Sequence, residues 1–150
     1  MAVCQGKTIS DLIATYQILL DLGYRHIAFN HSSIAYQEMF PEYKGLKASM
    51  YGRMEFIRRL VSINTIDKNA YHHLLGASDW REFQVYKDWN FIKSVDTSSP
   101  IINGAENIKF SYDMIYNKPE YKLEYYLEKD LSNNIDIIKH NVELFRKSIS

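Results

Sequence analysis

The chain has 150 residues, the length of one ordinary domain and enough to bury a hydrophobic core. Its residues are 46% apolar and 24% charged, which is typical of a globular protein and argues against a disordered one. Eighteen basic side chains balance eighteen acidic ones, so the overall charge does not indicate binding to nucleic acid or to a membrane, and any such binding would need a local patch.

The single cysteine, Cys4, cannot form an internal disulfide, and no cluster of cysteine and histidine has the spacing of a zinc site. No apolar segment reaches the roughly 18–20 residues that a membrane span needs. The first residues also lack the basic and then apolar pattern of a signal peptide. We therefore expect a protein of the cytoplasm that holds no metal and no cofactor.

A short strand and an amphipathic helix are predicted at the start of the chain. Residues 2–6 are mostly apolar and end in glycine, which is typical of the end of a strand. A helix is predicted over residues 9–22, where apolar side chains recur at helical spacing. Thr8 or Ser10 can cap its beginning, and Gly23 lies where a glycine commonly ends a helix.

Three more strands and several helices are predicted further along the chain. The strands cover residues 26–30, 70–76 and 91–95. The helices cover residues 49–63, 80–86, 123–131 and 134–148. The residues expected to face inward are Met50, Met54, Ile57, Leu60 and Val61 in the first of these helices and Ile135, Ile138, Val142 and Phe145 in the last. Ser78 or Asp79 can cap the second of them, and Pro100 and Gly104 predict a loop.

Alternation of strands and helices predicts an α/β fold with a parallel sheet covered by helices, in a single domain over residues 1–150. In such folds the functional groups gather where the strands end. The four predicted ends carry Gln5-Gly6, Asn30-His31-Ser32, Gly76-Ala77-Ser78 and Asp96-Thr97-Ser98. Each of these sets also has the composition of a turn or a helix cap.

Asp96 is the residue in this chain best suited to chemistry. It follows an apolar strand, it is ionised at neutral pH, and a strand end can hold a compact carboxylate rigidly enough for nucleophilic attack. The hydroxyl groups of Thr97 and Ser98 are near enough in sequence to orient it. Position alone is also compatible with a helix cap or a loop acid.

At these same strand ends the chain resembles the tRNA-guanine transglycosylase family, including its phage and bacterial branch that inserts 7-deazaguanine derivatives into DNA. Val3-Cys4-Gln5-Gly6 resembles the family's V-Q-G strand, and residues 27–32 occupy the place of its G-G-L-S segment. Leu74-Leu75-Gly76 resembles its L-M-G segment. Val95-Asp96, followed by Ser-Ser-Pro and Asn103-Gly104, resembles the strand that presents the nucleophilic aspartate.

The resemblance implies a partial (β/α)8 barrel, made of the last four β/α units and C-terminal helices, that exchanges a base in DNA or tRNA. DNA is the favoured substrate, and a phage-encoded protein would act in the host cytoplasm. Asp96 would be the nucleophile, and the substrate-binding residues would be Gln5, Gly6, Asn30, Leu75 and Gly76. A separate N-terminal half or a homo-oligomer is expected as partner, because a full barrel takes about 250 residues.

The chain departs from the family pattern in several places. The family's second catalytic aspartate and its base-reading aspartate belong to the first half of the barrel, and its C-x-C-x2-C…H zinc site is absent from this sequence. Asn30 lies near a family glycine, which would narrow the base pocket or change the base that it accepts. Two other interpretations stay open: a non-catalytic remnant or binding module of the same fold, and an unrelated small α/β protein.

Two further patterns have a structural and a functional interpretation. His72 and His73 are neighbours in a predicted strand, so one faces the core and the other faces away from it. A core histidine with a hydrogen-bond partner is the expected outcome for one of them. The basic stretch of Lys44, Lys47, Arg53, Arg58 and Arg59 could contact phosphates, but a solvated helix face is the commoner outcome for such a stretch.

Overall fold

The computed structural model describes residues 1–77, 79–113, 116, 118–119 and 121–149. The chain forms two compact units. The sheet unit comprises Met1–Ala77 and Asp88–Asp96, and the helical unit comprises Ser78–Lys87 and Thr97–Ser150. The possible cap residue Ser78 lies outside the described residues.

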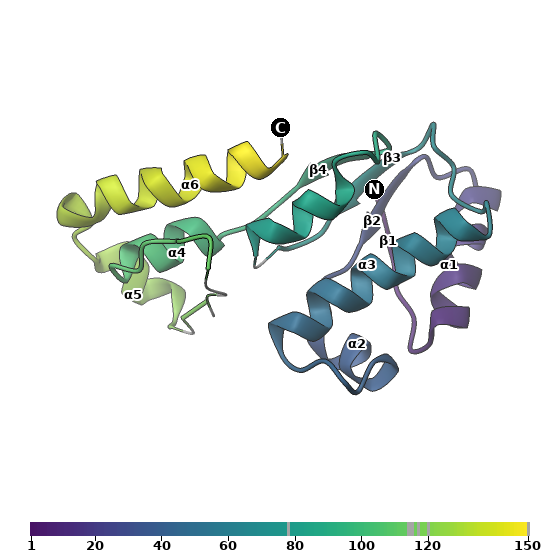
Figure 1. Ribbon diagram of the computed structural model, residues 1–150, viewed down its shortest axis with the longest axis horizontal. Coiled ribbons are helices and arrows are strands. Elements are labelled where there is room, and N and C mark those ends of the chain that lie inside the picture. The colour runs from purple at the N-terminus through teal and green to yellow at the C-terminus, as the bar shows by residue number, and fades with distance from the viewer. Residues whose placement is uncertain (78, 114–115, 117, 120, 150) are drawn as a thin grey trace. The chain divides into compact units, whose positions relative to one another are not determined.

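The sheet unit is built on four parallel strands, which confirms the predicted α/β class (Figure 1). The strands are β1 (Ala2–Cys4), β2 (His26–Phe29), β3 (Tyr71–Leu74) and β4 (Ile92–Val95). Their order in the sheet, β1-β2-β3-β4, is their order in the chain. Because all pairs are parallel, the four carboxyl ends lie along one edge of the sheet.

The crossovers of the sheet unit contain α1 (Ile9–Asp21), α2 (Ser33–Met39) and α3 (Leu46–Ser62). α1 contacts α3, so these two helices cover the same face of the sheet (Figure 1). The inward residues predicted for α3 are buried except Val61, which is partly exposed. α2 was not predicted; the Ser32 hydroxyl caps it by accepting a hydrogen bond from the Ala35 amide at 3.3 Å.

α1 begins and ends where the sequence predicts. The Thr8 hydroxyl accepts a hydrogen bond from the Asp11 amide at 3.1 Å, and the Asp11 carboxylate accepts one from the Thr8 amide at 3.0 Å. This reciprocal pair is a capping box, which satisfies two backbone donors that the first turn leaves free. At the other end Gly23 has a φ of +85°, the left-handed conformation that glycine adopts readily.

The adjacent histidines of β3 face opposite sides of the sheet, as the alternation predicts. His72 is fully buried, and its Nε2 is 2.9 Å from the Tyr16 hydroxyl of α1. Burial lowers the pKa of His72, so this core histidine is neutral at physiological pH. On the other face, strand pairing aligns Val3, Ala28, His73 and Ser94 in one row.

The helical unit contains η1 (Trp80–Tyr86), α4 (Ser99–Ala105), α5 (Leu123–Glu128), η2 (Ser132–Asn134) and α6 (Ile135–Ile149). The predicted helix over residues 80–86 is a 3-10 helix, capped by Asp79. The loop predicted around Pro100 is instead α4, because proline is well accommodated in the first turn of a helix.

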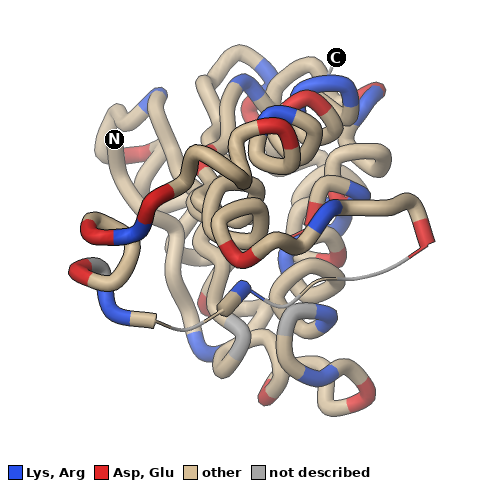
Figure 2. Tube along the Cα trace, turned by 90° about the vertical axis from the view of Figure 1, so that its left-hand side faces the viewer, with Lys and Arg blue, Asp and Glu red and all other residues tan. Residues whose placement is uncertain are grey.

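In α6, Ile135 is 45% exposed although the apolar spacing predicts it inward. Phe145 is buried as the spacing predicts, and Ile138 and Val142 are partly buried. Leu144 and Asn141, which the spacing does not place inward, are also buried, and the Asn141 side chain bonds the backbone of Ile108 and Phe110. Acidic and basic residues are interspersed along the trace, with uncharged stretches between them (Figure 2). Among the residues described, no helix is both long enough and apolar enough to cross a membrane.

Candidate functional site

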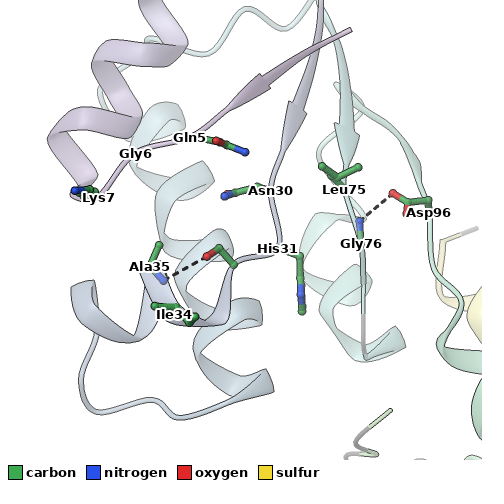
Figure 3. A pocket seen from close by; sticks show the side chains of 11 residues that line it. Gln5, Gly6, Lys7, Asn30, His31, Ile34, Ala35, Leu75, Gly76 and Asp96 are labelled. Carbon is green, nitrogen blue, oxygen red and sulfur yellow. Dashed lines mark hydrogen bonds between the residues drawn. The ribbon is translucent and has the colours of Figure 1, made fainter. Parts of the chain in front are cut away.

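An open pocket of about 920 Å³ lies where the parallel strands end (Figure 3). The six residues predicted as catalytic or substrate-binding all line it: Gln5, Gly6, Asn30, Leu75, Gly76 and Asp96. Lys7, His31, Ser32, Ile34 and Ala35 complete the lining. The structure therefore brings together residues that are up to 91 positions apart in sequence, from Gln5 to Asp96.

The Asp96 carboxylate is held by one of its two oxygens. Oδ1 accepts a hydrogen bond from the Gly76 amide at 2.9 Å (Figure 3). Oδ1 also lies 2.9 Å from Nε2 of His73. Both of these contacts use the same oxygen, and the side chain is 58% exposed. The carboxylate is thus fixed on one side and open to a ligand on the other.

The surroundings of Asp96 favour its charged form. Partial burial by itself raises the pKa of the carboxyl group. The hydrogen bonds from Gly76 and His73 and the charge of His73 act in the opposite direction and outweigh burial, so the pKa lies below its ordinary value. Asp96 is therefore ionised at neutral pH, as a carboxylate nucleophile must be.

His73 connects Asp96 to Ser94 on β4. Its Nδ1 is 2.6 Å from the Ser94 hydroxyl, while its Nε2 faces Asp96. A register shift beyond His72 leaves Lys93 unmatched and pairs His73 with Ser94. Ser94 and Asp96, which alternation puts on one face of β4, therefore lie on the same face of the sheet as His73. With Ser94 on one ring nitrogen and Asp96 on the other, the imidazole has a fixed orientation.

Thr97 and Ser98, expected to orient Asp96, have other partners. The Thr97 hydroxyl accepts a hydrogen bond from the Ser99 amide at 3.1 Å. The Ser98 hydroxyl accepts one from Nζ of Lys118 at 3.3 Å. Within the sheet unit, the carboxylate is oriented by His73 of β3 and by Gly76, which follows that strand.

Both pocket glycines are required by the backbone. Gly76 has a φ of +70°, and a β-carbon there would lie 3.3 Å from Cβ of His31. At Gly6 a β-carbon would lie 2.7 Å from the backbone nitrogen of Leu12, so the loop after β1 could not approach α1 as it does. Glycine at these positions has a structural reason that is independent of any ligand.

Two amide side chains face the pocket from neighbouring strand ends. Gln5 follows β1 and is exposed, and Asn30 follows β2 and is partly buried (Figure 3). The hydroxyl of the buried Tyr36 donates a hydrogen bond to Oδ1 of Asn30 at 3.3 Å. This contact positions the Asn30 amide, and the exposed Gln5 can offer both a donor and an acceptor.

Arg53 is a part of the site that the sequence did not identify as such. It belongs to the predicted basic stretch but is fully buried, with Nη1 donating to the carbonyl oxygens of Gly76 at 2.8 Å, Leu75 at 3.2 Å and Phe29 at 3.4 Å. Arg58, in contrast, is exposed and pairs with Glu55 at 3.2 Å. The stretch is therefore divided between a buried structural cation and a solvated helix face.

His31 is the second group that Arg53 affects. Burial first, and the neighbouring charge of Arg53 second, lower the pKa of His31 to about 4. His31 thus lines the pocket as a neutral imidazole at pH 7, with one nitrogen able to donate and the other able to accept. Within the described residues, no three His, Cys, Asp or Glu side chains are arranged to hold a metal ion.

Comparison of the chain with models of protein families, with curated proteins and with solved structures gives no match.

Proposed function

We propose that this chain is a base-exchange glycosyltransferase, or part of one, that replaces a base in nucleic acid by guanine or a 7-deazaguanine through Asp96. One observation carries the proposal: Asp96 lies in the pocket with one oxygen held and the other open, beside amide groups suited to the edge of a purine. The four strand-end motifs that resemble the transglycosylase family supply the reaction class.

In the first step, Oδ2 of Asp96 attacks C1′ of the target nucleotide. A C–O bond forms, the bond between C1′ and the base nitrogen breaks, and the base leaves with the electron pair and takes a proton from water. The product is a glycosyl ester of Asp96. Hydrogen bonds from Gly76 and His73 to Oδ1 aim the opposite oxygen at the sugar.

In the second step, a nitrogen of the incoming base attacks C1′ from the face that the first base left. The ester C–O bond breaks, the Asp96 carboxylate is regenerated, and the proton of the attacking nitrogen passes to water. Two inversions at C1′ retain the configuration of the nucleoside, as in retaining glycosidases. Neither step requires a cofactor.

The other pocket residues suit recognition of a flat base. Gln5 can pair with a donor and an acceptor on a purine edge, and Asn30, held by Tyr36, adds a further polar group. Leu75 offers apolar contact, and the backbone at Gly76 lets a ring approach closely. Asn30 lies near the place of a family glycine, so its side chain would narrow the pocket around the incoming base.

The proposal includes a partner that completes a barrel. Strands in sequential parallel order are the arrangement of a (β/α)8 barrel, and closure takes eight of them. The other four would come from a separate N-terminal half or from a second copy of this chain. In duplex DNA, the favoured substrate, the target nucleotide must leave the base stack before attack.

The test is transfer of labelled guanine or labelled 7-deazaguanine into DNA and tRNA, by the chain alone and with the product of the adjacent reading frame. Asp96→Asn is expected to abolish transfer, whereas Asp88→Asn, at an exposed position of the same unit, is expected to retain it. Absence of transfer under both conditions contradicts the proposal. Binding of nucleic acid without transfer would support the alternative function, a non-catalytic binding module.

A further inference from the structure

The Leu75–Gly76 peptide group lies between a buried cation and the site carboxylate. Its carbonyl oxygen accepts a hydrogen bond from Nη1 of Arg53 at 3.2 Å, and its N–H donates to Oδ1 of Asp96 at 2.9 Å. The peptide is trans, so its C=O and N–H point in opposite directions. The guanidinium and the carboxylate are thus joined through one peptide unit.

Hydrogen bonds in such a chain strengthen one another, because a cation on the carbonyl oxygen polarises the amide and makes its N–H a better donor. The effect is greatest at low dielectric, and Arg53 is fully buried. Arginine is suited to this place, since it stays charged at any physiological pH and its planar guanidinium can serve several acceptors.

We propose that Arg53 is a positioning residue for Asp96, acting through the Leu75–Gly76 peptide. The guanidinium fixes the loop after β3 by bonding the carbonyls of Leu75 and Gly76, and it also reaches Phe29 at the end of β2. The loop in turn presents the Gly76 N–H to Oδ1, which keeps Oδ2 directed into the pocket.

A second observation is consistent with this arrangement. Gly76 has a φ of +70°. In this conformation the Gly76 N–H donates to Asp96, and the Gly76 carbonyl oxygen accepts a hydrogen bond from Arg53 at 2.8 Å. The guanidinium therefore bonds the oxygens of both peptide groups that flank the Gly76 α-carbon. Removing the cation should loosen the turn and weaken its hydrogen bond to the carboxylate at once.

The experiment is an NMR titration of the full chain that follows the Asp96 side-chain carboxyl carbon and the Gly76 amide proton. In the native chain both are expected to titrate with one midpoint, and the Gly76 proton should move upfield as Asp96 is protonated. Arg53→Gln keeps a donor for the carbonyls but removes the charge. It is expected to raise the Asp96 midpoint and to shift the Gly76 proton upfield at neutral pH.

Arg53→Lys keeps the charge. Its Asp96 titration midpoint and its Gly76 proton shift are both expected to lie between those of Arg53→Gln and those of the native chain. Arg58→Gln, at an exposed position of the same helix, is the matched control and should titrate as the native chain does. A folded Arg53→Gln chain with native midpoint and native Gly76 shift overturns the proposal. If that variant does not fold, the native chain still tests the proposal. A Gly76 amide proton whose chemical shift does not change as Asp96 is protonated would also overturn it.

This inference rests on the proposed function only for the reaction that Asp96 performs. The titration uses no substrate, so its outcome is independent of base exchange. If exchange is absent while Arg53 controls the Asp96 titration, the proposed function fails and the positioning role stands. If exchange occurs while Asp96 in Arg53→Gln titrates as it does in the native chain, the proposed function stands and the positioning role of Arg53 fails.

Discussion

His31 makes the stability of the sheet unit depend on pH in a window set by its pKa. The pKa is about 4 in the folded chain against an ordinary value of 6.5. Because the folded state resists protonation, the unfolded state binds more protons between these two values. The contribution of the neutral His31 to the free energy of unfolding is therefore complete above pH 6.5 and is lost as the pH falls toward 4.

The magnitude follows from the size of the shift. One proton taken up on unfolding changes the free energy of unfolding by about 1.4 kcal/mol per pH unit, so His31 accounts for at most about 3.5 kcal/mol over the window. The pKa of His72 is also lowered, so His72 causes a further loss of stability on acidification. The lowered pKa of Asp96 acts below its ordinary 3.8, outside this window.

The assay is urea unfolding of the native chain, His31→Asn and His26→Asn at intervals between pH 4 and pH 7. His31→Asn cannot titrate and should lose less stability on acidification, by up to about 1.4 kcal/mol per pH unit. His26 is exposed on the strand that precedes the pocket residues, so His26→Asn is the matched control and should follow the native slope. Equal slopes for His31→Asn and the native chain would show that His31 does not cause this pH dependence.

Three further changes test the packing around the site. Gly76→Ala should destabilise the fold by about 1–2 kcal/mol through its left-handed φ, and by more than Gly23→Ala, which has a φ of +85° but open space around it; equal urea midpoints would contradict this. Tyr16→Phe leaves buried polar partners unpaired and should cost about 1–3 kcal/mol, whereas the exposed Tyr24→Phe should cost almost nothing in the same assay. His73→Phe removes a donor to the site carboxylate and should raise its pKa, seen by carbon NMR; an unchanged midpoint would show that the contact does not matter.

The site could be anticipated to the extent that it follows from strand order. Alternating strands and helices predict a parallel sheet, and a parallel sheet brings its carboxyl ends together. Gln5, Asn30, Gly76 and Asp96 therefore fall into one pocket from pattern alone. The same logic assigns His72 and His73 to opposite faces, because side chains alternate along a strand.

The contacts that tune the site could not be predicted, because they depend on tertiary register. Arg53 shares the inward face of its helix with Met50 and Ile57, a signal that it is buried, but no local pattern names its carbonyl partners. The Ser94 contact depends on the register shift beside His73. The sequence does not distinguish the helix around Pro100 from a loop, because proline occurs both in loops and in first helical turns.

Capture of the covalent intermediate is the direct test of Asp96 as the nucleophile. The chain, alone and with its proposed partner half, is incubated with a guanine-containing oligonucleotide without an incoming base, denatured, digested and mapped by mass spectrometry. We expect a sugar–phosphate adduct on the peptide that contains Asp96, absent in Asp96→Asn and present in Asp88→Asn. An adduct on any other residue, or base exchange that persists in Asp96→Asn, would contradict it.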